Sequence, residues 1–112
     1  MQVESTVDIS LVMRTLGDPT RRGLYEAIVA RGEVTVAKLA AQVPVSQPAV
    51  SQHLKVLRAA GLVKERRAGR NAFYSSDPDG LVPLFDWLDH YGAFWRDRLA
   101  ALKGLLEEID PK

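Results

Sequence analysis

The stretch with the most suggestive chemistry is PVSQPAVSQHLKVLRAAGLVKERRAGR, which runs from Pro44 to Arg70 and combines amides, hydroxyls and cations. Amide and hydroxyl side chains hydrogen-bond to the edges of DNA bases, and lysine and arginine bind phosphate oxygens. Residues 46–70 contain six basic residues and one acidic residue, Glu65, although the whole chain has a net charge of +1. A local basic surface on a nearly neutral protein indicates a polyanionic partner.

A predicted helix over residues 47–60 would sort these side chains by direction. At about 100° per residue, Val50, Leu54 and Leu57 fall within about 60° of one another and form the buried stripe. Gln52 then points away from the stripe, and no Asp or Glu lies in this helix. An ordinary solvated face carries both charge signs, so a plain amphipathic surface helix is the weaker alternative. The outward, flanking and tip residues are Gln47, Pro48, Ser51, Gln52, His53, Lys55 and Arg58, preceded by Ser46 as the N-cap.

Two strand-length runs follow this helix and predict a β-hairpin, the wing, over residues 62–76. LVKERR and NAFYSS are joined by Ala68-Gly69-Arg70-Asn71, which has turn chemistry. A narrow basic hairpin can enter a minor groove or follow a phosphate backbone. A charged edge strand that prevents aggregation is the alternative interpretation. The basic residues around the turn are Lys64, Arg66, Arg67 and Arg70.

The elements that position this surface follow from helical spacing and capping residues. Helices are expected over residues 5–16 and from Pro19 to Arg31, the second one capped by Asp18. Thr35 caps a short helix over residues 36–43, and Ser46 caps the next helix only three residues later. Helices joined so tightly must cross steeply, as in a helix-turn-helix over residues 35–60.

A long final helix over residues 79–109 completes a fold that is mainly α with a small β-hairpin. The predicted order is four helices, two strands and a last helix, which is a winged helix-turn-helix in a single domain over residues 1–112. The helices over residues 5–16 and 79–109 are expected to serve dimerisation.

The final helix is too long and too apolar for one subunit to cover. Its roughly 30 residues extend about 45 Å, whereas the rest of the chain would form a body roughly 30 Å across. Leu84, Leu88, Tyr91 and Trp95 are expected to face the subunit's own core, while Phe85, Trp87 or Phe94 meet a partner. A homodimer satisfies both faces, and an effector pocket between the aromatic residues and the second helix is the alternative. The expected interface residues are Val7, Leu11, Phe85, Trp87, Leu88, Tyr91, Phe94, Trp95 and Leu99.

Three segments resemble the ArsR-type winged-helix transcriptional repressors. They are LGDPTRRGLYEAI, TVAKLAAQVPVSQPAVSQHLKVLRAAGLV and KERRAGRNAFYSSD, and the resemblance is close over residues 10–78 and loose over the final helix. It implies a homodimer that binds an inverted-repeat operator in double-stranded DNA and leaves it when an inducer binds. It places Gln47, Pro48, Ser51, Gln52 and Lys55 at base-reading or backbone-contacting positions. His53 falls at a recurring histidine that either touches phosphate or braces the helix.

No cofactor and no metal are expected. Metal-sensing relatives use a cysteine pair or Asp and His ligands, but this chain has no cysteine, and its last helix has Asp86 and Asp89 with a single histidine, His90. Zinc needs more nitrogen or sulfur donors than this. The resemblance therefore favours the family members without a metal-sensing site, and a small-molecule effector stays open.

The remaining observations limit the classes of function that the chain can have. Without cysteine, with two distant histidines and without a phosphate-binding glycine motif, the chain shows no catalytic set, so it is not expected to be an enzyme. It has no apolar run near 18 residues and no signal-peptide pattern, and a cytoplasmic protein is expected. The alternative function is a winged-helix protein-interaction module without DNA binding, which would need an exposed apolar patch on the helix over residues 47–60.

Overall fold

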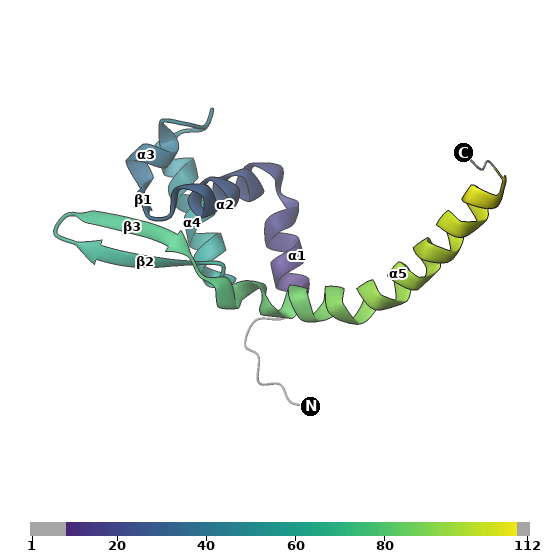
Figure 1. Ribbon diagram of the computed structural model, residues 1–112. Coiled ribbons are helices and arrows are strands. Elements are labelled where there is room, and N and C mark those ends of the chain that lie inside the picture. Colours follow the sequence, from purple (N-terminus) through teal and green to yellow (C-terminus); the bar gives the residue numbers. More distant parts are fainter. Residues whose placement is uncertain (1–8, 110–112) are drawn as a thin grey trace.

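The computed structural model describes residues 9–109 as a helical body, a three-stranded sheet and a long projecting helix (Figure 1). The expected fold class, mainly α with a winged helix-turn-helix, is confirmed. The start of the first predicted helix, with Val7, lies outside the described residues. The elements are α1 (Ile9–Gly17), α2 (Pro19–Arg31), β1 (Val34–Thr35), α3 (Val36–Ala40), α4 (Gln47–Ala59), β2 (Val63–Ala68), β3 (Asn71–Ser76), the 3₁₀ turn η1 (Pro78–Leu81) and α5 (Val82–Ile109).

Side-chain caps determine where three of the helices begin, as the sequence predicts. The carboxylate of Asp18 accepts hydrogen bonds from two first-turn amides of α2, and the hydroxyls of Thr35 and Ser46 each accept one from α3 and α4. These oxygens satisfy amide groups that have no partner inside the helix. After α4, Gly61 has a φ of 78°, a left-handed conformation that glycine adopts without a steric penalty.

Two helices differ from the expected bounds by more than one residue. The helix predicted to reach residue 43 ends at Ala40, and the amide of Gln42 closes its last turn on the carbonyl of Leu39 at 3.0 Å. Pro44 limits how far this helix can extend, because a proline disfavours the helical conformation in the residue before it, here Val43. The final helix begins at Val82 rather than at residue 79, because Pro78–Leu81 form a separate 3₁₀ turn capped by Asp77.

A short strand that the sequence analysis missed turns the wing into part of a sheet. Val34 and Thr35 of β1 pair with Tyr74 and Phe73, so β3 lies between β1 and β2. The only local signal was the β-branched run Val34-Thr35-Val36, two residues after Gly32. The register fixes which wing residues face the body, since alternate residues of a strand point to opposite faces.

The core lies beneath α4. Val50, Leu54 and Leu57, the predicted buried stripe, have no exposed surface. They pack with Leu24 and Ile28 of α2 and with other apolar residues of the body. The rotation of α4 is therefore set by its apolar side, and the opposite side is turned outward.

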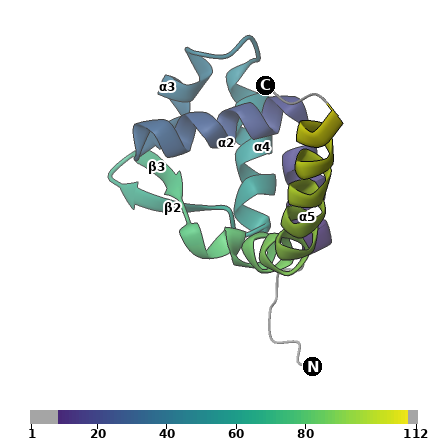
Figure 2. The ribbon, with the colours of Figure 1, turned by 45° about the vertical axis from the view of Figure 1, so that its right-hand side comes forward.

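The helix α5 projects away from the body, with only its first turns against α1 and η1 (Figures 1 and 2). It has no buried residue, and the radius of gyration of the chain is 18.8 Å. A compact domain of this length would have a radius of gyration of about 13 Å. Of the residues expected to face the subunit's own core, Leu84 packs against it, but Leu88, Tyr91 and Trp95 are exposed. That expectation is wrong for these three, because the helix runs past the end of its own body.

Candidate nucleic-acid interface

The outward side of α4 carries amides and a cation and no carboxylate. Gln47, Pro48, Gln52 and Lys55 are exposed, and Ser51 is half-buried on the flank. Within residues 9–109, the side chains of Gln52 and Lys55 form no hydrogen bond or ion pair with the rest of the chain. These groups are therefore available to an external partner, in the arrangement that major-groove recognition by a helix requires.

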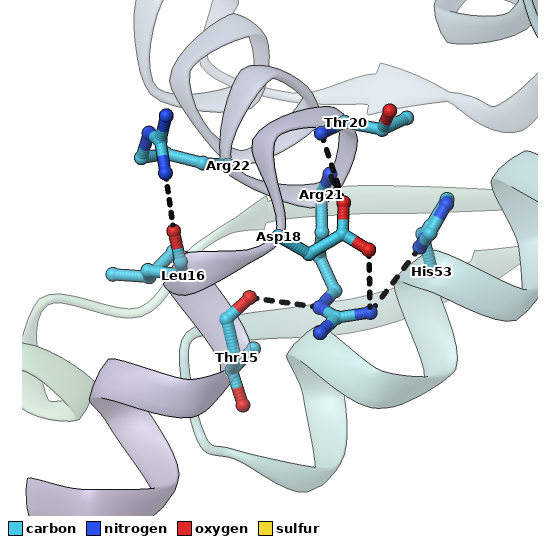
Figure 3. Close-up of polar contacts among 7 residues, drawn as sticks. All are labelled: Thr15, Leu16, Asp18, Thr20, Arg21, Arg22 and His53. Atoms are coloured by element: carbon cyan, nitrogen blue, oxygen red, sulfur yellow. Dashed lines mark hydrogen bonds and ion pairs between the residues drawn. The ribbon is translucent and has the colours of Figure 1, made fainter.

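His53 is tied to the junction of α1 and α2 through Arg21 (Figure 3). The Nε of Arg21 donates to the carbonyl of Thr15 at 2.8 Å, and its Nη1 lies 3.4 Å from Nδ1 of His53. Because an arginine can only donate, Nδ1 of His53 accepts and the ring proton belongs on Nε2. Of the two alternatives for this histidine, the geometry favours bracing the helix.

Asp18 completes the same junction. Its carboxylate caps α2 and lies 3.6 Å from Nη1 of Arg21 (Figure 3). The hydrogen bond from the Arg21 amide is the largest cause that lowers the pKa of the Asp18 carboxyl below its ordinary value. One arginine thus joins the cap of α2, the end of α1 and the middle of α4.

Glu65, the single acidic residue of the basic stretch, links α4 to the wing. Its side chain is only 9% exposed and pairs with Arg58 at the end of α4 and with Nε of Arg67 at 3.4 Å. The hydroxyl of Tyr74 donates to the same carboxylate at 3.3 Å. Burial, followed by the charge of Glu65, raises the pKa of the Tyr74 hydroxyl. Two of the predicted DNA-contacting arginines are thus engaged within the chain.

Arg66 is engaged on the other face of the sheet. Its Nε lies 2.9 Å from Oε2 of Glu33, its Nη2 lies 2.9 Å from Oε1, and its guanidinium stands 4.7 Å from the ring centre of Phe73. Hydrogen bonds from Arg66 lower the pKa of the Glu33 carboxyl, and Glu33 raises the pKa of Arg66. Glu33 could not be found from the sequence, because only the β1–β3 pairing brings it beside the wing.

The wing tip lies close to the start of α4. Arg70 and Asn71 line a hollow of about 260 Å³ together with Gln47 and Ser51. In the part of the chain that the structure describes, neither Lys64 nor Arg70 forms an ion pair. The structure therefore brings Gln47, Ser51 and Arg70 together, with Gln52 and Lys55 further along the same helix.

An effector pocket between the aromatic residues and the second helix is the alternative to a dimer core that the sequence leaves open. A hollow of about 420 Å³ does lie along α5, but its lining comes from α5 alone: Phe85, Asp86, Leu88, Asp89 and Arg96. Among residues 9–109, no group of three His, Cys, Asp or Glu side chains is arranged to hold a metal ion.

Comparisons with known proteins agree with this geometry. A family model described as a helix-turn-helix domain matches residues 16–66. The HTH-type transcriptional regulator Rv2034 of Mycobacterium tuberculosis is 46% identical over 97 residues, which cover 87% of this chain and 84% of that protein. The solved ArsR-like transcriptional regulator from Rhodococcus sp. RHA1 has a TM-score of 0.67 and 33% identity, covering 86% of this chain and 90% of its own. The chain belongs to the ArsR-type winged helix-turn-helix regulators.

This family membership identifies the class of activity. The solved transcriptional repressor BigR from Xylella fastidiosa, with a TM-score of 0.59 and 32% identity, covers 77% of this chain and 85% of its own. ArsR-type regulators are DNA-binding transcriptional regulators, and this chain is one of them. None of the helices between residues 9 and 109 combines the length and apolar character needed to cross a membrane.

Proposed function

We propose that this ArsR-type regulator is a homodimeric repressor that binds an inverted-repeat operator through α4 and the wing. The observation that carries the proposal is the outward face of α4, a helix without Asp or Glu, where Gln52 and Lys55 are exposed and unpaired within the described residues. Amides supply the hydrogen bonds that discriminate bases, and cations supply the phosphate contacts.

The same face argues against a protein-interaction module. A partner helix or strand would need an apolar patch on α4, but Val56, 38% exposed, is the one large apolar side chain exposed on that helix. A single exposed apolar residue is ordinary for a protein surface. Double-stranded DNA therefore fits the exposed chemistry of α4 better than a protein partner does.

The apolar side of α5 supports the dimer. One stripe begins with Leu84 on the subunit's own core and continues at helical spacing through Leu88, Tyr91, Trp95 and Leu99, all of which are exposed. An exposed apolar stripe of this length is unfavourable in water. A second copy of the same helix would bury it against an equally apolar surface. Such a pairing would also hold two recognition helices about 34 Å apart, the spacing of successive major grooves.

A selection of bound fragments from random and genomic DNA tests the proposal. We expect an enriched inverted repeat whose half-sites are centred one helical turn apart. Lys55→Ala should weaken binding to the selected sequence, whereas Lys103→Ala, which removes an exposed cation from α5, should not. Enrichment of no sequence, together with salt-independent binding, would contradict the proposal and favour the protein-interaction module.

A further inference from the structure

Because side chains alternate along β2, the basic residues of the wing lie on opposite faces of the sheet. Glu65 pairs in register with Tyr74, and Arg66 pairs with Phe73. Tyr74 packs against the core, and its other neighbour in register, Val34, is buried, so this face is turned toward the body. Arg66 and Phe73 therefore lie on the outer face, away from α4.

On that outer face, Arg66 crosses the sheet. It starts on β2, its guanidinium covers the ring of Phe73 on the central strand β3, and it ends on both carboxylate oxygens of Glu33, one residue before β1. We call these three residues the strap. The strap connects β2, the strand at the far edge of the sheet, to the residue that precedes β1, the strand continuous with the body.

We propose that Arg66 is a positioning residue for operator binding: it fixes the angle of the wing through the strap and does not itself bind phosphate. This role of Arg66 rests on the proposed DNA-binding function. Within the wing, Arg66 positions the hairpin and Arg70 contacts the DNA. Arg70, at the tip beside Gln47 and Ser51, is the residue that the strap positions against the DNA backbone.

The geometry of the guanidinium distinguishes this role from a phosphate contact. To reach DNA, Arg66 would have to leave two parallel hydrogen bonds and the face of Phe73 together. A bidentate, stacked arginine cannot be replaced by lysine, whose compact ammonium lacks the planar fork. A simple phosphate contact, in contrast, tolerates lysine.

Operator titrations over a range of salt concentrations test this division. We expect Arg66→Lys to weaken operator binding about tenfold, because the wing must then be ordered on binding. The slope of log affinity against log salt should not change, because Arg70 still makes its phosphate contact once the wing is in place. Arg70→Lys should bind as the parent does, and Arg70→Ala should reduce the magnitude of the slope by about 0.9 per subunit. If Arg66→Lys kept full affinity, or if Arg66→Ala reduced the slope as Arg70→Ala does, Arg66 would be a phosphate contact and the proposal would be overturned.

A charge swap between Arg66 and Glu33 distinguishes a positioning role of Arg66 from a phosphate contact more directly. Arg66→Glu alone should bind poorly, and adding Glu33→Arg should recover much of the lost affinity by rebuilding the ion pair in reverse, with the net charge of the parent. If the double variant bound no better than Arg66→Glu, the proposal would fail.

Hydrogen exchange, measured without DNA, tests whether the strap holds the wing even if the proposed function is wrong. Hydrogen exchange of the β1 and β3 amides should be severalfold faster in Glu33→Gln than in the parent, because the hairpin loses one attachment to the body. Unchanged exchange in a folded Glu33→Gln variant would show that the strap does not hold the wing. An absence of any DNA binding by the parent, together with faster exchange in the variant, would refute the proposed function and the role of Arg66 in DNA binding.

Discussion

Trp95→Ala should abolish most of the self-association of this regulator. Trp95 is 55% exposed on the apolar stripe of α5, which corresponds to about 120 Å² of surface for a partner to cover. At about 25 cal/mol per Å², this area is worth about 3 kcal/mol per subunit. In a symmetric dimer each copy contributes once, so complete coverage would be worth about 6 kcal/mol in the dimer.

Incomplete burial of Trp95 and the entropy lost on ordering the interface reduce this free energy of association. If half of the area is effective, the dimer dissociation constant of Trp95→Ala should rise by about two orders of magnitude. Tryptophan at the centre of an apolar interface is typical of the residues that dominate association energy.

Sedimentation equilibrium from nanomolar to tens of micromolar protein measures the change directly. Val29→Ala is the matched control, because Val29 is 51% exposed but lies on α2, away from the stripe. A dissociation constant that is equal for Trp95→Ala and the parent would refute the assignment of α5 as the dimer contact. A parent protein that stays monomeric at tens of micromolar would refute the dimer itself.

Three further changes have effects that follow from the structure. Gly80→Ala should lower the free energy of unfolding by about 3 kcal/mol in urea denaturation, because the new Cβ would stand 2.1 Å from a backbone oxygen after α4, whereas Gly104→Ala meets nothing within 4 Å. The lowered pKa of Glu33 means that its pairing with Arg66 is fully present above the ordinary carboxyl value of 4.5 and is lost as pH falls through the lowered value. Hydrogen exchange should therefore show the wing loosening in acid, and Glu33→Gln should lack this transition. Gln52→Ala should relax base preference at one operator position, worth about 1–3 kcal/mol of discrimination, without changing the salt slope.

The features that the sequence predicts well depend on local chemistry. Asp18, Thr35 and Ser46 precede helices and cap them, and the spacing of Val50 and Leu54 sets the rotation of α4. Each of these depends on residues within one or two helical turns of one another. This is why the outward face of α4 could be assigned without a structure.

The features that the sequence does not predict depend on distant pairings. Glu33 and Arg66 are 33 positions apart and meet only because a two-residue strand joins the sheet. The spacing of Leu88 and Trp95 predicts an apolar stripe, but it cannot say whether the chain's own core or a second molecule covers it. In both cases the residues are visible in the sequence, but the partners that they contact depend on the three-dimensional structure.

These pairings also change how the charge of the basic stretch should be counted. Of its six cations, Arg58 and Arg67 share Glu65, and Arg66 is held by Glu33. That leaves Lys55, Lys64 and Arg70 unpaired within residues 9–109. With about 0.9 counterions released per phosphate contact, a dimer should show a salt slope of about −5 rather than the roughly −11 that composition would give. A measured slope near −11 would mean that the three paired arginines leave their carboxylates on DNA, and the strap would then be a resting state of the wing rather than its support.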